Sequence, residues 1–132
     1  MIVKFDVPFT TEKTRKTLKR DGDSYILPRG IYFLFSEAGT PEMPSPVFLE
    51  GANKNSFRQM VGHNPTVSIR NEDLCKIGHL SIDVLAESVK LTDLNSTNGT
   101  FINDERIATK EISQVGNYPI RAGDYKFNLL IE

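Results

Sequence analysis

A period-two alternation of apolar and polar residues is the feature that most restricts how this chain can fold. In the segment Tyr125–Ile131 every second residue is large and apolar, and Lys126 and Asn128 lie between them. The first residues of the chain, "IVKFDVPF", alternate in the same way. Strand side chains point alternately to two faces, whereas helical side chains repeat about every 3.6 residues. No long apolar stripe has the helical period and turn residues recur at short intervals, so an all-β sandwich or barrel is predicted.

Short runs of aromatic and β-branched residues between turn signals predict the individual strands. Pro8 has no N–H, so it favours an edge position for the first strand. Asn98-Gly99 lies between two such runs and signals a tight hairpin, because both residues tolerate a positive φ. The predicted strands are 2–9, Gly30–Ser36, Pro46–Gly51, Phe57–Val61, Val67–Ile69, Leu80–Leu85, Val89–Thr92, Phe101–Ile102 and Tyr125–Ile131.

Two segments are predicted to be long loops. The segment 36–46, "SEAGTPEMPSP", holds three prolines and a glycine and cannot be a central strand or a helix. The segment Thr10–Asp23 is rich in lysine and arginine, and Leu18 is its only large apolar residue. It reads as a solvated loop or a basic hairpin; the alternative is a patch for acidic partners, because close like charges repel unless something neutralises them.

Size and charge limit the class of protein. A chain of 132 residues has room for one domain with an ordinary core. With 16 Lys+Arg against 17 Asp+Glu, binding to nucleic acid or a membrane surface over the whole molecule is not expected. There is no signal-peptide pattern or membrane-length apolar run, and Cys75 is the single cysteine, which together predict an intracellular protein of cytoplasm or nucleus.

The common signatures of catalysis and metal binding are missing. The sequence has no Gly-rich phosphate loop ending in Gly-Lys-Ser/Thr, no paired-cysteine spacing and no nucleophile elbow. Cys75 and His79 stand four residues apart, which would suit a metal only on a helix, and this region reads as loop and strand. No serine is placed beside His63 or His79 by the local pattern. We therefore predict no catalytic residues, no metal and no cofactor.

The order of motifs from Val61 to Glu132 resembles a forkhead-associated (FHA) domain, a β-sandwich that typically binds phosphothreonine peptides through its loops. The family motif Asp-Leu-x-Ser-x-Asn-Gly-Thr-x-x-Asn is matched by "DLNSTNGTFIN", from Asp93 to Asn103. The segment "RAGDYKF" resembles the family's Gly-Asp turn and closing strand.

Two earlier family motifs are degenerate. "VGHNPTVSIRNED" resembles the Gly-Arg opening, with His63 in the place of the arginine. "CKIGHLSI" resembles the Ser-Arg-x-His element, with His79 on the histidine and Lys76 on the serine; a shift of one residue would instead align Cys75 and Lys76.

The resemblance implies an FHA-like β-sandwich of two antiparallel or mixed sheets, with an extra N-terminal strand and long loops. A single domain is expected over 1–132, with N-terminal strands and elaborations in 1–60 and the FHA motifs in 61–132.

The resemblance also assigns the site. A phosphate ester carries nearly two negative charges, so it requires converging donors. By family analogy Thr97 would donate to the phosphate, Asn98 would hold the ligand backbone, and His63 and Lys76 would supply charge. Other family positions would support the loops, namely His79, Ser96, Gly99 and Asn103, with Thr100. Open alternatives are a self-capping turn at Thr97 and Asn98, loss of phosphate binding at His63, and Arg58 or Arg70 as donors.

Three functions compete. The first is a phosphothreonine-peptide-binding interaction module. The second is an FHA-like scaffold that binds a protein partner without phosphate, for example through its N-terminal strand on a partner's edge. The third is nucleic-acid binding through Thr10–Asp23, which the near-neutral charge disfavours. The first is preferred because Lys76 can partly restore the charge lost at position 63.

Overall fold

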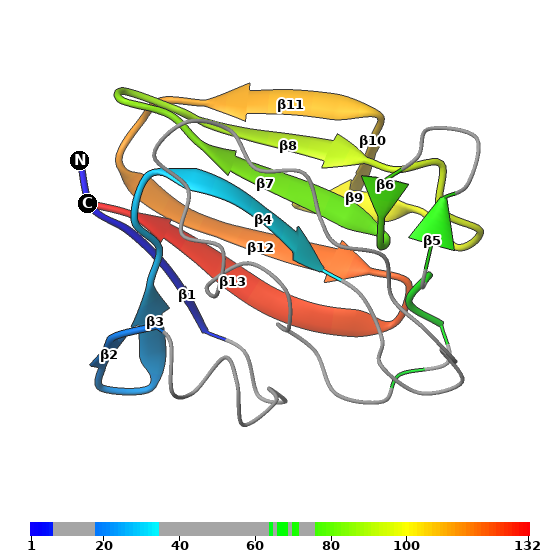
Figure 1. Cartoon of the computed structure of the whole chain (residues 1–132), viewed down its shortest axis with the longest axis horizontal. Helices are drawn as coiled ribbons and strands as arrows, with labels where there is room; N and C mark the ends of the chain where they lie inside the picture. Colours follow the sequence, from blue (N-terminus) through cyan, green and yellow to red (C-terminus); the bar gives the residue numbers. More distant parts are fainter. Residues whose placement is uncertain (7–17, 35–63, 65, 69, 72–75) are drawn as a thin grey trace.

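The computed structural model describes residues 1–6, 18–34, 64, 66–68, 70–71 and 76–132. Every regular element among these residues is a β-strand, in two larger antiparallel sheets and one short ladder. Figure 1 shows the two sheets as stacked layers, with both chain termini at one end. The predicted all-β sandwich is therefore confirmed.

The larger sheet has seven strands in the order β10-β9-β12-β13-β1-β3-β2. Its last strand, β13, coincides with the predicted segment, and its alternate apolar residues are buried while Lys126 is exposed. The strands are β1 (Val3–Asp6), β2 (Arg20–Asp21), β3 (Ser24–Ile26), β9 (Thr100–Ile102), β10 (Glu105–Ile107), β12 (Gly116–Ala122) and β13 (Tyr125–Ile131).

The smaller sheet has four strands in the order β11-β8-β7-β4, and β5 and β6 form a separate ladder. In Figure 1 this ladder lies at the end of the sandwich opposite the chain termini. The strands are β4 (Gly30–Leu34), β5 (Arg70–Asn71), β6 (Lys76–Ile77), β7 (Leu80–Val84), β8 (Val89–Asp93) and β11 (Thr109–Ile112).

The core lies between the two sheets. Phe5 and Leu129 of the larger sheet and Tyr32 and Leu80 of the smaller sheet are at most 1% exposed and belong to one apolar cluster. Burying a large apolar side chain contributes about 1.5–3 kcal/mol each. The packed layers give the loops at their ends a rigid base.

The N-terminal strand is an interior strand, which corrects two expectations. β1 pairs with β13 on one side, as in Val3↔Ile131, and with β3 on the other, as in Phe5↔Tyr25. Both edges of its described residues are used, so the expected interface, in which this strand pairs with a partner's edge, is wrong. Pro8, the reason for expecting an edge, lies outside the described residues.

The expected hairpin at Asn98-Gly99 is also wrong. β8 and β9 belong to different sheets, and residues 94–99 cross between them. The tight turn lies instead at Asn103-Asp104 between β9 and β10, where φ is +49° and +64°. A type I′ hairpin turn requires positive φ at both central residues, and asparagine and aspartate tolerate it.

Other strands also differ from the prediction. Val67 and Ser68 lie in a loop and not in the predicted strand 67–69. β10, β11 and β12 were not predicted. β10 and β11 are mostly exposed and polar, and in β12 only Ile120 and Ala122 are buried, so none of the three has an apolar alternation along its whole length. The predicted strands Pro46–Gly51 and Phe57–Val61 and the loop 36–46 lie outside the described residues.

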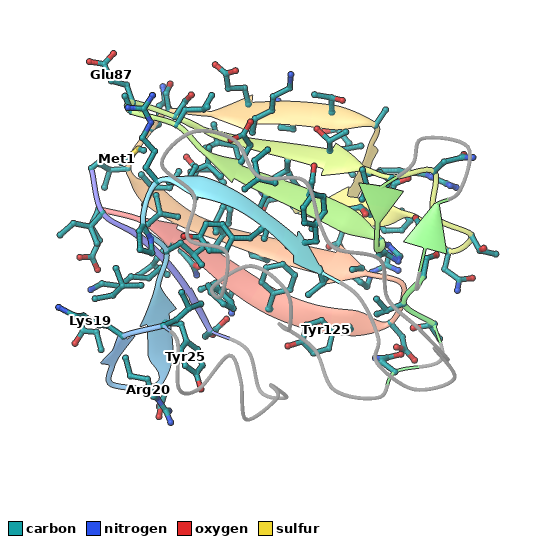
Figure 2. The ribbon with its side chains drawn as sticks, in the orientation of Figure 1. Met1, Lys19, Arg20, Tyr25, Glu87 and Tyr125 are labelled. Atoms are coloured by element: carbon teal, nitrogen blue, oxygen red, sulfur yellow. The ribbon has the colours of Figure 1, made fainter. Side chains whose placement is uncertain are left out.

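The basic segment Thr10–Asp23 is described only from residue 18. Leu18 is buried, and β2 and β3 form a hairpin around the turn Gly22-Asp23. Figure 2 shows Arg20 and Tyr25 on this hairpin. The Arg20 guanidinium carbon lies 5.2 Å from the centroid of the Tyr25 ring. In the described part of the chain, no helix is long and apolar enough to cross a membrane.

Candidate functional site

The loop that crosses from β8 to β9, residues 94–99, is organised by one carboxylate. Asp93 Oδ1 accepts hydrogen bonds from Ser96 Oγ at 2.5 Å and Thr100 Oγ1 at 2.7 Å, and Oδ2 accepts from the Ser96 N–H at 3.0 Å. The Gly99 N–H in turn donates to Ser96 Oγ at 3.0 Å. Ser96 and Thr100 are buried, so their hydroxyls shape the loop from inside.

Gly99 combines a positive φ with a close approach to its neighbours, so a side chain here would be strained and would crowd them. Its φ is +85°, and a Cβ at this position would lie 3.0 Å from Arg106 Nε and 3.2 Å from Phe101 Cε2. The glycine of the motif therefore seats the crossing loop directly against β9 and β10.

His79, just before β7, joins this loop to a second one. Its side chain is fully buried; Nε2–H donates to the Gly99 carbonyl at 2.8 Å, and Nδ1 accepts the Ser68 N–H at 3.0 Å. The two bonds require the neutral imidazole, with its proton on Nε2. Burial lowers the pKa of His79, and the bond to Gly99 and the nearby Asp93 carboxylate offset this only in part.

The second loop contains Asn64 and residues 66–68. The Thr97 N–H donates to Ser68 Oγ at 3.2 Å, and Asn98 Nδ2 donates to the Thr66 carbonyl at 2.8 Å. The crossing loop and the second loop are thus bonded directly as well as through His79.

The Gly123-Asp124 turn between β12 and β13 anchors the second loop from the other side. The Asp124 N–H donates to Thr66 Oγ1 at 2.8 Å, and the Thr66 hydroxyl hydrogen-bonds the Asp124 carboxylate. Bonds from Thr66 and Asn64 lower the pKa of Asp124. The Gly123 N–H also donates to the Gly99 carbonyl at 3.0 Å, so the turn contacts both loops.

Two hydroxyls are left at the surface where the loops meet. Thr97 and Asn98 are exposed, and the Thr97 hydroxyl makes no hydrogen bond to another described residue. Ser68 Oγ accepts from Thr97, and its own proton has no acceptor among the described residues. Ser68 was missed because "VSI" reads as a strand; the loop became visible only through its bonds to His79 and Thr97.

The other predicted site residues are placed only in part. His63, Cys75 and Arg58 lie outside the described residues. The backbones of Lys76 and Arg70 lie in β6 and β5.

Asn103 lies in the exposed β9–β10 turn, where its N–H donates to the Pro119 carbonyl at 3.0 Å. In the described residues no three His, Cys, Asp or Glu side chains are grouped as metal ligands, and both ring nitrogens of His79 are hydrogen-bonded.

Comparison with known proteins points in one direction. Residues 59–125, more than half of the chain, match the family model of the FHA domain. No curated protein matches the chain.

Solved structures with a similar fold include the FHA domain of the CT664 protein from Chlamydia trachomatis, with a TM-score of 0.59 and 18% identity over 100% of this chain and 99% of that one. A structure from a study of phosphothreonine-dependent FHA domain interactions has a TM-score of 0.52 and 20% identity over 100% and 98% of the two chains. The FhaA FHA domain, complexed with the intracellular domain of Rv3910, has a TM-score of 0.51 and 22% identity over 96% and 98%. At these identities the likeness shows the fold.

Proposed function

The chain belongs to the FHA domain family, and from this we propose that it is a protein–protein interaction module that binds phosphothreonine peptides. One of the similar structures comes from work on phosphothreonine-dependent FHA interactions, and another is a complex with a protein domain. Both support this function by analogy.

The observation that carries the proposal is the pair of uncommitted hydroxyls on clamped loops. Thr97 and Ser68 come from different loops, and each has a hydroxyl proton with no acceptor among the described residues. A phosphate group offers strong acceptor oxygens, and donors that are already held in place lose little entropy on binding it. In this proposal both hydroxyls donate to the phosphate.

In this proposal Asn98 hydrogen-bonds the backbone of the bound peptide. One amide proton of Asn98 is used on the Thr66 carbonyl, which holds the side chain in place. Its Oδ1 and second amide proton remain for a peptide N–H and C=O. His63 and Lys76 supply positive charge, and His79, Ser96 and Gly99 support the loops, with Asn103 in the adjoining turn. No residue has a catalytic role here.

Titration with a degenerate phosphothreonine peptide library, beside the unphosphorylated and phosphoserine libraries, tests the function. Asn98→Ala should weaken phosphothreonine binding about tenfold, or about 1.4 kcal/mol. Asn117→Ala, an exposed asparagine on β12, is the matched control and should bind like the wild type. Folded wild-type protein that binds no phosphopeptide would contradict the proposal. An equal loss of thermal stability and affinity in Asn98→Ala would make that residue structural.

The charge at position 63 can be tested by pH. A free histidine titrates near pH 6.5 and a phosphate ester has its second ionisation near pH 6. Between about pH 6.5 and 8.5 the free histidine loses its proton, so affinity should fall if His63 pairs with the phosphate. His63→Arg should flatten the profile, because arginine stays charged. A flat wild-type profile would assign the charge to Lys76.

A further inference from the structure

A row of basic side chains crosses the outer face of the larger sheet. Arg106 of β10 is opposite Phe101 of β9, Phe101 is opposite Arg121 of β12, and Arg121 is opposite Lys126 of β13. Residues directly opposite in a sheet share a face, so these four side chains form one line across four strands, which we call the basic row.

The charges of the basic row are not balanced within the described residues. Arg121 and Lys126 are directly opposite, and like charges in that position destabilise a sheet. The ion pairs among described residues involve Lys4 and His79, and none includes a cation of the row. The Arg121 guanidinium instead lies over the Phe101 ring, 3.9 Å from the centroid, and donates to the Gly123 carbonyl at 3.1 Å.

The row borders a groove of about 830 Å³ on the same face, which Phe101, Arg121 and Lys126 help to line. Three carboxylates line other parts of the groove. Two of them lie in turns, and the third is opposite Asn128, two residues along β13 from Lys126. Asp104 and Asp23 belong to the β9–β10 and β2–β3 turns, and Asp6 accepts hydrogen bonds from the N–H and Nδ2 of Asn128. Arg20 also lines the groove, so three cations and three carboxylates line it in all, and the two cations that lie directly opposite each other are Arg121 and Lys126 of the row.

The row is continuous with the phosphothreonine site. A Cβ on Gly99 would lie within about 3 Å of both Arg106 and Phe101, so the loop that carries Thr97 and Asn98 packs against the start of the row. Strands are about 4.8 Å apart, so three spacings make the row about 14 Å long, or about four extended peptide residues. A peptide bound at the loop reaches the row within a few residues.

We propose that the basic row binds acidic side chains of the same peptide whose phosphothreonine occupies the loops, within about six residues of it. The inference rests on the proposed function and names its ligand class, a phosphothreonine flanked by aspartate or glutamate. A short row beside a peptide site fits a peptide better than a nucleic-acid backbone, and the net charge of −1 agrees.

The test uses three phosphothreonine peptides: one with neutral flanks, one with four glutamates before the phosphothreonine and one with four after it. At low salt one acidic flank should raise the affinity of the wild type about fivefold through two or three exposed charge pairs. At about 1 M salt, where the screening length is about 3 Å, the gain should vanish.

The variant Arg121→Gln/Lys126→Gln should lose this gain, so that it binds the acidic and the neutral peptides with equal affinity. Lys90→Gln/Lys110→Gln, which alters two exposed lysines of the smaller sheet, is the matched control and should keep it. Because Arg121 also contacts Gly123, Lys126→Glu is a second variant that keeps this contact, and it should reduce the gain because the charge of the row falls from +3 to +1.

The outcomes separate the two proposals. Equal affinity for the neutral and acidic peptides, or a gain that survives in both variants, overturns the role of the row and leaves phosphothreonine binding intact. Binding of a single-stranded oligonucleotide that depends on Arg121 and Lys126, with no gain for acidic peptides, makes the row a nucleic-acid surface. Failure of every phosphopeptide overturns the proposed function itself and the ligand class with it.

Discussion

At the scale of single residues, His79 is the histidine whose protonation state the fold determines. Its buried ring donates to Gly99 and accepts from Ser68, so a second proton would place two N–H groups against each other at Nδ1. Neutral imidazole is therefore part of the loop architecture. The consequence is a stability that depends on pH in the mildly acidic range.

The sign of this dependence follows from the pKa. The pKa of His79 is lowered below its ordinary value of 6.5 by burial. Below pH 6.5 the unfolded chain binds a proton at this histidine that the folded chain does not bind. The free energy of unfolding therefore decreases as the pH is lowered, until the pKa of the folded state is reached. The slope from this one group is at most about 1.4 kcal/mol per pH unit.

The variant His79→Gln keeps a hydrogen-bond donor and an acceptor at this position, but the glutamine side chain does not titrate. We expect the variant to be less stable than the wild type at pH 7.5 but to lose less stability on going to pH 5.5. Thermal unfolding of both proteins at the two pH values measures this. Parallel profiles would mean that His79 does not contribute to the pH dependence.

At the scale of elements, two hairpins of the larger sheet have the same turn sequence in different surroundings. Gly22-Asp23 joins β2 to β3 and Gly123-Asp124 joins β12 to β13, and the glycines have φ of +63° and +61°. A Cβ on Gly22 would have no neighbour within 4 Å, whereas one on Gly123 would lie 2.4 Å from the Thr66 carbonyl oxygen. A substitution at Gly22 therefore measures the cost of the positive φ alone, whereas a substitution at Gly123 adds the clash with Thr66.

Alanine at both positions is therefore a matched experiment. Gly22→Ala should cost about 1–2 kcal/mol through the positive φ alone. Gly123→Ala should cost more, because the clash displaces Thr66, and it should also weaken phosphopeptide binding through the Thr66–Asn98 bond. Urea unfolding and peptide titration give the two readouts. Equal stability costs and unchanged binding would show that the position of the second loop does not depend on this turn.

At the scale of the whole molecule, the two ends of the chain are hydrogen-bonded to each other. Ile2 and Glu132 exchange backbone hydrogen bonds of 3.0 and 2.8 Å, and Lys4 bonds Asp21 at 2.6 Å and Glu132 at 3.1 Å. Figure 1 shows the termini side by side. The N-terminal strand is therefore an integral strand of the larger sheet.

Phe5→Ala tests this integration. Phe5 is 1% exposed and its ring centroid lies 5.7 Å from that of Tyr25, so truncation should cost about 3–5 kcal/mol. Ile2→Ala, at a residue that is 49% exposed, should change stability by less than about 0.5 kcal/mol. Urea unfolding measures both. A stable Phe5→Ala protein would mean that β1 adds little to the core.

The sequence by itself determined the features that depend on local pattern. Alternation located β13 residue for residue, and the run Asp93–Asn103 located the loop with Thr97 and Asn98. These succeed because the period of a strand and the side chains of a loop motif are properties of consecutive residues. The family followed from the same motif.

The tertiary structure alone decided which segments are neighbours. It made Asn98-Gly99 a crossing between sheets, set β1 between β13 and β3, brought Ser68 to Thr97 and aligned the basic row from four strands. Strand pairing joins residues far apart in the chain, and its register depends on the packing of both sheets, which no local period specifies. That is the physical reason why the site's second loop and the basic row emerge only in the folded molecule.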